Sequence, residues 1–240
     1  MQNTTHYYHV LISKVLNSIY PLQCPSCGGE SDAFHHSPIC SSCWSKIERY
    51  PGPSCRICAL PLPSELSSIC FNCLKKAPPF SKVINFGLYE GVLSDAINHL
   101  KFHGLKRLAK TLGRLLLNFD LPDADGIVPV PLTVKRLRER GFNQSLLIAR
   151  VMSKEIKIPL LVDILFKKKE TPPQTGLSAK ERLSNLKNAF EVKGNIQGLR
   201  LLLVDDVMTT GATVTECSKQ LIKAGAEEVV VLTLARARMI

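Results

Sequence analysis

Apolar positions beyond residue 80 follow two alternating patterns. Short apolar runs, typical of buried strands, alternate with stretches in which apolar residues recur every three or four positions, as on one face of a helix. The strand-like runs are Val83–Tyr89, Gly126–Pro131, Leu161–Phe166, Ala189–Val192, Leu201–Val204 and Val229–Leu234. The helical stretches begin near Val92, Leu105, Asn143 and Ala212. Strands that alternate with helices predict an α/β fold with a mainly parallel sheet flanked by helices.

The first 80 residues contain much less apolar material. Apolar residues between Val10 and Ile19 recur at helical spacing and stop before Pro21, which predicts a short amphipathic helix. Pro78 and Pro79 predict a linker. We therefore expect a domain boundary near residue 80, with a small N-terminal module over 1–80 and the α/β domain over 81–240.

Eight of the nine cysteines form four Cys-x-x-Cys pairs: Cys24, Cys27, Cys40, Cys43, Cys55, Cys58, Cys70 and Cys73. Two residues between thiolates let one turn place both sulfurs on a single metal ion, and two such turns complete a tetrahedral site that suits zinc. We predict two structural Zn²⁺ ions, held by sequential or by crossed pairs. A disulfide framework or a set of redox thiols is the alternative. Cys217 shares an expected helix face with apolar residues, so we expect a core thiol there.

Aromatic residues of this module allow two interpretations. The apolar residues between Cys24 and Cys73 are few, so metal binding must supply much of the folding free energy. We expect Phe34, Trp44 and Phe71 to pack around the metal sites. Stacking on nucleobases is the alternative.

Composition and charge narrow the class of protein further. A hydrophobic content of 45% and a charged content of 21% exclude a largely disordered chain. The N-terminal stretch is too polar for a secretory signal, so we expect a cytoplasmic protein. The formal net charge is +11, and 25 basic against 16 acidic side chains place +9 of it in residues 81–240. Such a domain favours phosphates or nucleic acid as partners.

Chemistry-bearing residues cluster after the strand Leu201–Val204. Asp205 and Asp206 follow it directly, and a Thr/Gly loop then leads into a helix. Backbone N–H groups at a helix start hold phosphate, and a glycine allows close approach. Two carboxylates beside the loop can accept hydrogen bonds from neighbouring ribose hydroxyls. The run therefore predicts a site for a 5-phosphorylated ribose; a strand with an acidic end and a threonine cap is the alternative.

Two further segments lie where a ligand would bind in an α/β sheet. After the strand Gly126–Pro131 come four cations, Lys135, Arg136, Arg138 and Arg140. They suit pyrophosphate with Mg²⁺, or else form a solvated basic face or a nucleic-acid contact. The polar loop over 172–182 lies between candidate strands, and its Lys180 and Arg182 can bring positive charge to a pyrophosphate group. Its alternative is a capped helix start with ordinary surface cations.

The run Leu201–Thr213 resembles the PRPP-binding signature of type I phosphoribosyltransferases, in which an apolar strand, two acids and Thr-Thr-Gly-x-Thr occur in this order. The resemblance implies a PRPP site made by Asp205, Asp206, Val207, Met208, Thr209, Thr210, Gly211, Ala212 and Thr213. Lys135 and Arg136 join this site as the cations that follow the strand Gly126–Pro131. The resemblance also implies that the loop over 172–182 closes over the reaction centre, with catalytic roles for Asp205, Asp206, Lys180 and Arg182.

The order of all the motifs is similar to that of the ComF family, also called the ComFC or GntX-like family, over nearly the whole chain. The motifs are the tandem Cys-x-x-Cys pairs, Leu-Lys-Phe at 100–102, Val-Pro-Val-Pro at 128–131, Arg-Glu-Arg-Gly-Phe-Asn-Gln at 138–144, Pro-Gln-Thr-Gly-Leu at 173–177 and the Asp-Asp loop. The resemblance implies a double zinc-ribbon module over 1–80 and a type I phosphoribosyltransferase-like domain over 81–240.

This resemblance also implies a function. It is that of a cytoplasmic protein of natural transformation and DNA uptake which binds Mg²⁺–PRPP and single-stranded DNA. The density of cations on a basic domain makes part of the DNA contact our own prediction for Lys135, Arg136, Arg138 and Arg140. Competence proteins such as a ComFA-type helicase or a DprA-type loader are the implied partners. Transfer of phosphoribose to an unknown acceptor, with release of pyrophosphate, follows if the site is active. The alternative is a phosphoribosyltransferase of nucleotide metabolism with no role in DNA handling.

Overall fold

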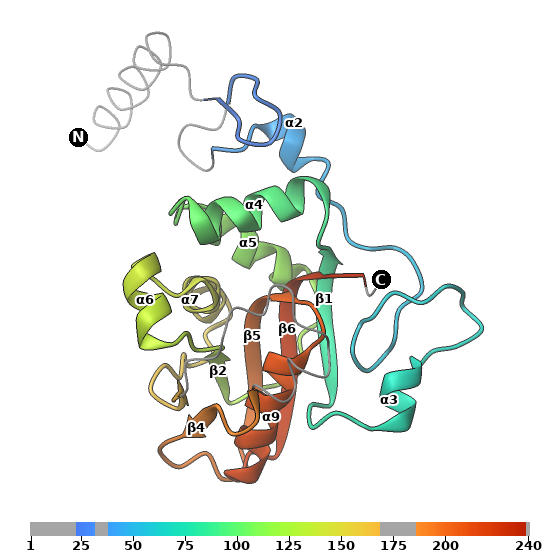
Figure 1. Ribbon diagram of the computed structural model, residues 1–240, viewed down its shortest axis with the longest axis vertical. Helices are drawn as coiled ribbons and strands as arrows, with labels where there is room; N and C mark the ends of the chain where they lie inside the picture. The colour runs from blue at the N-terminus through green and yellow to red at the C-terminus, as the bar shows by residue number, and fades with distance from the viewer. Residues whose placement is uncertain (1–22, 32–37, 169–185, 239–240) are drawn as a thin grey trace.

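The computed structural model describes residues 23–31, 38–168 and 186–238 (Figure 1). Its main sheet has four parallel strands in the order β1-β6-β5-β2. Their bounds are β1 (Lys82–Leu88), β2 (Gly126–Pro129), β5 (Arg200–Met208) and β6 (Glu228–Arg236). The apolar runs of β5 and β6 are buried on both faces, as expected for central strands of a parallel sheet. The predicted α/β fold is confirmed.

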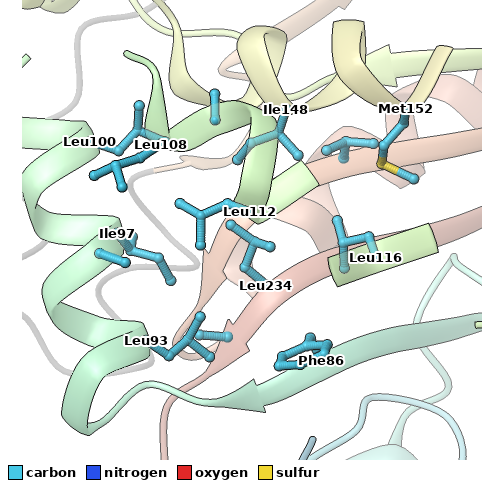
Figure 2. Close-up of a cluster of buried hydrophobic side chains, with 14 of the residues drawn as sticks. Phe86, Leu93, Ile97, Leu100, Leu108, Leu112, Leu116, Ile148, Met152 and Leu234 are labelled. Carbon is cyan, nitrogen blue, oxygen red and sulfur yellow. The ribbon is translucent and has the colours of Figure 1, made fainter. Parts of the chain in front are cut away.

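Three helices and a 3₁₀ turn cover one face of the sheet: α4 (Gly91–Phe102), α5 (Leu108–Leu115), η1 (Leu116–Asn118) and α7 (Gln144–Ile156). Their apolar stripes meet the even-numbered residues of β5 and β6 in one cluster, part of which Figure 2 shows. Leu112 of α5 and Ile148 of α7 are fully buried there, beside Leu234 of β6. The apolar spacing predicted these helices, and Asn143 caps α7 by accepting from two backbone N–H groups.

The opposite face is covered by α9 (Ala212–Lys223). Val214, Cys217 and Leu221 of this helix pack with the odd-numbered residues of β5 and β6. Cys217 is fully buried, which confirms the expected core thiol.

Two predicted strands do not join the main sheet. β3 (Leu165–Lys167) and β4 (Phe190–Val192) pair antiparallel as a separate two-stranded sheet. β3 is also shorter than the apolar run Leu161–Phe166: Leu161 lies outside it, and its N–H donates to the carbonyl of Ile127 in β2 at 2.8 Å.

The basic run after β2 is helical rather than a loop. It forms α6 (Val134–Arg140), which begins where the side chain of Thr133 accepts from the N–H of Arg136. It ends at Gly141, whose φ of 75° lies in the left-handed region.

The cysteine-rich segments lie against the α/β part at two places. Cys24, Cys40 and Cys43, the last within α2 (Ser41–Trp44), share the core cluster of α4 and α5. The segment that ends in α3 (Phe71–Lys75) lies along β1, where the N–H of Val83 donates to the carbonyl of Ile57 at 2.8 Å. This contact covers an edge strand that would otherwise be open to pairing. The predicted helix between Val10 and Ile19 lies outside the described residues. Over the described ranges, no helix has the length and apolar character needed to cross a membrane.

Candidate ligand cavity and metal centres

The eight paired cysteines form two separate sulfur clusters. Cys24, Cys27, Cys40 and Cys43 make one, and Cys55, Cys58, Cys70 and Cys73 make the other, with all four sulfurs of each cluster within 4.8 Å of one another. A tetrahedral zinc site with bonds of about 2.3 Å has sulfur–sulfur edges of about 3.8 Å. The observed edges include 3.8 Å between Cys27 and Cys40 and 3.6 Å between Cys58 and Cys70. The pairing is therefore sequential, and each donor set fits one Zn²⁺.

The two clusters repeat the same supporting hydrogen bonds. The N–H of Cys40 donates to Sγ of Cys24 at 3.4 Å, and the N–H of Cys70 donates to Sγ of Cys55 at 3.3 Å. Such bonds orient and stabilise thiolate ligands. Because four sulfurs fill each tetrahedron, neither centre keeps an open position for substrate, so both fit a structural role.

The aromatic residues near the metal centres behave differently from one another. Trp44 is partly buried, as expected. It packs against the cluster that the helices α4, α5 and α7 form with one face of the sheet and with Cys24, Cys40 and Cys43, here called the first core cluster. Phe71 is 74% exposed, so the expectation that it packs around the metal is wrong. Phe71 stands on the outer side of a five-residue helix that buries only Cys73. Phe34 lies outside the described residues.

A cavity of about 890 Å³ opens at the carboxyl ends of β2 and β5. Both carboxylates of the Asp-Asp pair line it, together with the cations Lys101, Arg136, Arg140 and Lys167. The site thus combines acceptors for hydroxyl groups with positive charge for anions, as a phosphorylated sugar requires. Its position matches the general rule for ligands in open α/β sheets.

Asp205 and Asp206 lie within β5 rather than beyond its end. The strand continues to Met208 because its last residues stay in register with β6, with Asp205 opposite Thr233. Each carboxylate also accepts the N–H of the next residue: Asp206 N–H donates to Asp205 at 2.9 Å, and Val207 N–H donates to Asp206 at 2.8 Å. Pairing with β6 and these bonds fix both side chains.

The environment of Asp205 favours its neutral form. The side chain is buried, and its Oδ1 accepts from the hydroxyl of Ser145 at 3.1 Å. Burial, followed by repulsion from the neighbouring Asp206, raises the pKa of Asp205 to about 7. Lys101 and the hydrogen bonds oppose this shift without cancelling it.

Asp206 forms an ion pair with Lys101 at the end of α4, 2.7 Å between Nζ and Oδ2. Apart from this pair, Oδ2 has no hydrogen-bond partner among the described residues. Both side chains are largely buried. Only the family resemblance points to the Leu-Lys-Phe segment at 100–102, and the sequence spacing does not predict that Lys101 lies beside Asp206. The packing of α4 over the sheet brings them together.

The Thr/Gly loop has the shape expected of an anion-binding turn. Gly211 has a φ of 80° and precedes the first turn of α9, and a Cβ atom there would collide with the end of the Met208 side chain. Val207, Thr209 and Thr213 line the cavity. Met208 and Ala212 are buried, and the hydroxyl of Thr210 accepts from the N–H of Ala212 at 3.4 Å. Of the predicted loop residues, three therefore face the ligand space and the others shape the turn.

The four cations of the basic run divide into two pairs. Arg136 and Arg140 line the cavity, whereas Lys135 and Arg138 are exposed on α6 and are not among its lining residues. Burial lowers the pKa of Arg140, which marks it as a partly desolvated cation. Lys167, at the end of β3, is a further lining cation that the sequence analysis missed. Lys180 and Arg182 lie outside the described residues.

Comparison with known proteins finds two family models in this chain. A double zinc ribbon domain matches residues 15–74, and a phosphoribosyl transferase domain matches residues 143–239. Competence protein F of Haemophilus influenzae is 38% identical over 233 residues, covering 92% of this chain and 99% of that protein. DNA utilization protein YhgH of Escherichia coli is 38% identical over 214 residues, covering 85% of this chain and 92% of that protein.

Among solved structures, a glutamine phosphoribosylpyrophosphate amidotransferase from B. subtilis matches 52% of this chain and 25% of its own, with 24% identity and a TM-score of 0.38. The match of the family model and the parallel sheet identify the C-terminal part as a phosphoribosyltransferase-type fold.

Proposed function

Because the chain belongs to the family of competence protein F, we propose that it is a cytoplasmic protein of DNA uptake that binds Mg²⁺–PRPP and single-stranded DNA. One observation carries the PRPP part of the proposal. Asp205 and Asp206 line a cavity that also receives the loop before α9. Hydroxyl acceptors and a phosphate-binding turn thus occur side by side.

Each part of PRPP has a partner of suitable chemistry. The carboxylates of Asp205 and Asp206 accept hydrogen bonds from the ribose hydroxyls. The loop from Thr209 to Thr213 holds the 5-phosphate with backbone N–H groups and hydroxyls at the N-terminus of α9. Arg136 and Arg140 face the pyrophosphate, where guanidinium groups form paired, charge-assisted bonds.

The carboxylate oxygens also suit Mg²⁺, which neutralises pyrophosphate charge when it is bound with PRPP. Lys101 adds positive charge beside Asp206, 2.7 Å away. Arg140 and Lys167 add more within the same cavity, from a different helix and strand. These side chains orient the pyrophosphate and stabilise its charge, which is most of what phosphoribosyl transfer requires from a protein.

The DNA part of the proposal has separate support. The relatives are named for competence and for DNA utilization. Residues 81–240 carry 25 basic and 16 acidic side chains, and the exposed pair Lys135 and Arg138 offers phosphate contacts outside the cavity. Neutralising phosphates releases counterions and drives binding that is independent of sequence.

Calorimetry with Mg²⁺–PRPP tests the first part of the proposal. Asp205→Asn and Asp206→Asn keep the size of the side chain and remove its charge. Each should therefore lower the affinity for PRPP about tenfold to a hundredfold. Asp125→Asn, an exposed carboxylate paired with Arg200, is the matched control and should leave affinity unchanged. No heat of binding with the wild type, or equal affinity in all three variants, contradicts the proposal.

Release of pyrophosphate decides whether transfer follows. The assay uses a panel of free nucleobases, with and without single-stranded DNA. Release with a free base alone supports a phosphoribosyltransferase of nucleotide metabolism. Release only with DNA supports transfer linked to DNA handling, and no release supports PRPP as a bound ligand that regulates or stabilises the protein.

A further inference from the structure

One aromatic side chain at the rim of the cavity is unusually open to solvent. Phe102, the last residue of α4, is 68% exposed although it lines the cavity. Phe142 lines the same cavity and is only 8% exposed, because it packs into the first core cluster. Core packing therefore accounts for the position of Phe142 and does not account for that of Phe102, whose ring would be more stable buried than exposed to water.

Positive charge lies directly beside this ring. The guanidinium carbon of Arg140 is 5.3 Å from the ring centroid of Phe102, within the range of a cation–π contact. Arg140 is itself held by a hydrogen bond to Gln144 at the start of α7. Lys106, in the segment that follows α4, stands 5.1 Å from the ring centroid of Phe142 but is not among the residues that line the cavity. The rim thus combines the exposed ring of Phe102 with the adjacent cation Arg140 of α6.

We infer that Phe102 is a stacking platform for a base of single-stranded DNA at the mouth of the PRPP cavity. The inference rests on the proposed binding of single-stranded DNA and names the residue on which a base stacks. An aromatic face accepts any base, and adjacent cations accept the flanking phosphates, so the arrangement suits a strand without regard to its sequence.

A strand fits this position better than a free nucleobase. A site for a small molecule encloses most of its ligand, whereas Phe102 stands at the open rim with about two thirds of its surface exposed. Lys135 and Arg138 lie exposed on the same short helix as Arg140. They can continue the phosphate path outside the cavity.

The test uses an oligonucleotide that carries one 2-aminopurine, and a second oligonucleotide of equal length in which every nucleotide is abasic. Phe102→Ala should weaken binding of the first about fivefold to 150-fold and remove the quenching that stacking causes. Phe102→Trp should restore both. The abasic strand should bind wild type and Phe102→Ala equally, because its phosphates are unchanged.

Leu66→Ala is the control, since Leu66 is a fully exposed apolar side chain of the N-terminal module and is not among the residues that line the cavity. It should leave quenching unchanged, and thermal unfolding should show that both variants keep the wild-type stability. Equal affinity of wild type and Phe102→Ala for the base-containing strand would overturn the inference. So would a loss confined to free adenine or a mononucleotide, which would assign Phe102 to a small-molecule acceptor.

PRPP calorimetry on the same proteins distinguishes a failure of the stacking role of Phe102 from a failure of the proposed function. Wild type that binds PRPP and the strand, with Phe102→Ala that binds both normally, removes only the stacking role. Wild type that binds no single strand removes the stacking role together with the DNA part of the proposed function and leaves PRPP binding intact.

Discussion

The guanidinium group of Arg236 donates a hydrogen bond from Nε to the carbonyl oxygen of Cys58, 3.3 Å away. The same side chain donates from Nη1 to the carbonyls of Met208, at 2.8 Å, and Thr209. Arg236 is only 2% exposed, at the end of β6. One buried cation therefore connects a cysteine of the second zinc centre to the turn that shapes the candidate phosphate site.

This connection predicts that loss of one zinc centre lowers the affinity for PRPP more than loss of the other. Cys55→Ser and Cys24→Ser remove equivalent ligands from the second and the first centre. Loss of the second centre should displace the carbonyl of Cys58 and loosen Arg236, since buried hydrogen bonds are costly to leave unmade. We expect Cys55→Ser to lower the affinity for PRPP about tenfold, as measured by calorimetry.

Cys24→Ser serves as the control for that comparison. The first centre contacts α4 instead, where the hydroxyl of Ser26 donates to Asp95 at 2.7 Å. Affinity in Cys24→Ser should stay within about threefold of wild type. Equal losses in the two variants would mean that Arg236 does not transmit the state of the metal centre.

Metal content gives a direct test of the sulfur clusters. The purified protein should contain about two zinc ions per chain, and Cys43→Ser should contain about one and unfold at lower temperature. Cys217→Ser provides the control, because Cys217 is a buried core thiol on α9 that belongs to neither cluster. It should keep two zinc ions even if it is less stable. A folded N-terminal module without metal would contradict the structural role.

The strands and helices could be predicted from the sequence where the apolar periodicity is strong. α6 was not predicted, because none of its seven residues is buried and its two apolar residues, Val134 and Leu137, are too few to define a periodicity. Its Lys, Arg, Leu and Glu residues nevertheless have good helix propensity, and Thr133 is a suitable cap, so composition held the missing signal. The end of β5 was also misplaced, because Asp is rare in strands and only pairing with β6 overrides that preference.

The candidate site could be predicted only where its residues follow one another in the chain. Asp205, Asp206 and the Thr/Gly loop lie together in sequence, so their chemistry was visible. Lys101 and Lys167 reach the same cavity from α4 and β3, and their positions depend on how these elements pack over the sheet. Such contacts cannot be predicted from the spacing of residues in the sequence, and neither can the hydrogen bond between Arg236 and Cys58.

The division of the basic helix predicts two separable effects. The double variant Arg136→Ala with Arg140→Ala removes the two α6 cations that line the cavity. It should lower the affinity for PRPP about tenfold or more. Lys135→Ala with Arg138→Ala removes exposed cations and should leave PRPP affinity within about twofold. The second pair should instead reduce the slope of log affinity for single-stranded DNA against log salt by up to about 1.4. An unchanged slope in the second pair would remove this part of α6 from the DNA surface.

The raised pKa of Asp205 predicts a stability effect with a definite sign. Its pKa is about 7 in the folded protein and about 4 in the unfolded chain, so between these values the folded state binds more protons. Stability should therefore fall as pH rises from about 4 to above 7, by an amount on the order of 4 kcal/mol before local relaxation. Asp206, Lys101 and Lys167 are the charged groups around this carboxylate.

Asp205→Asn removes that dependence while keeping Oδ1 as an acceptor for Ser145 and for the N–H of Asp206. In urea unfolding, the stability of Asp205→Asn relative to wild type should rise from pH 5 through the folded pKa of about 7 and then level off towards pH 8.5. Asp125→Asn is the control: the N–H of Arg200 lowers the pKa of the exposed Asp125, so its relative stability should be flat over this range. A flat profile for Asp205→Asn as well would show that Asp205 is already ionised at pH 5. It would then be ready to accept ribose hydroxyls without first losing a proton.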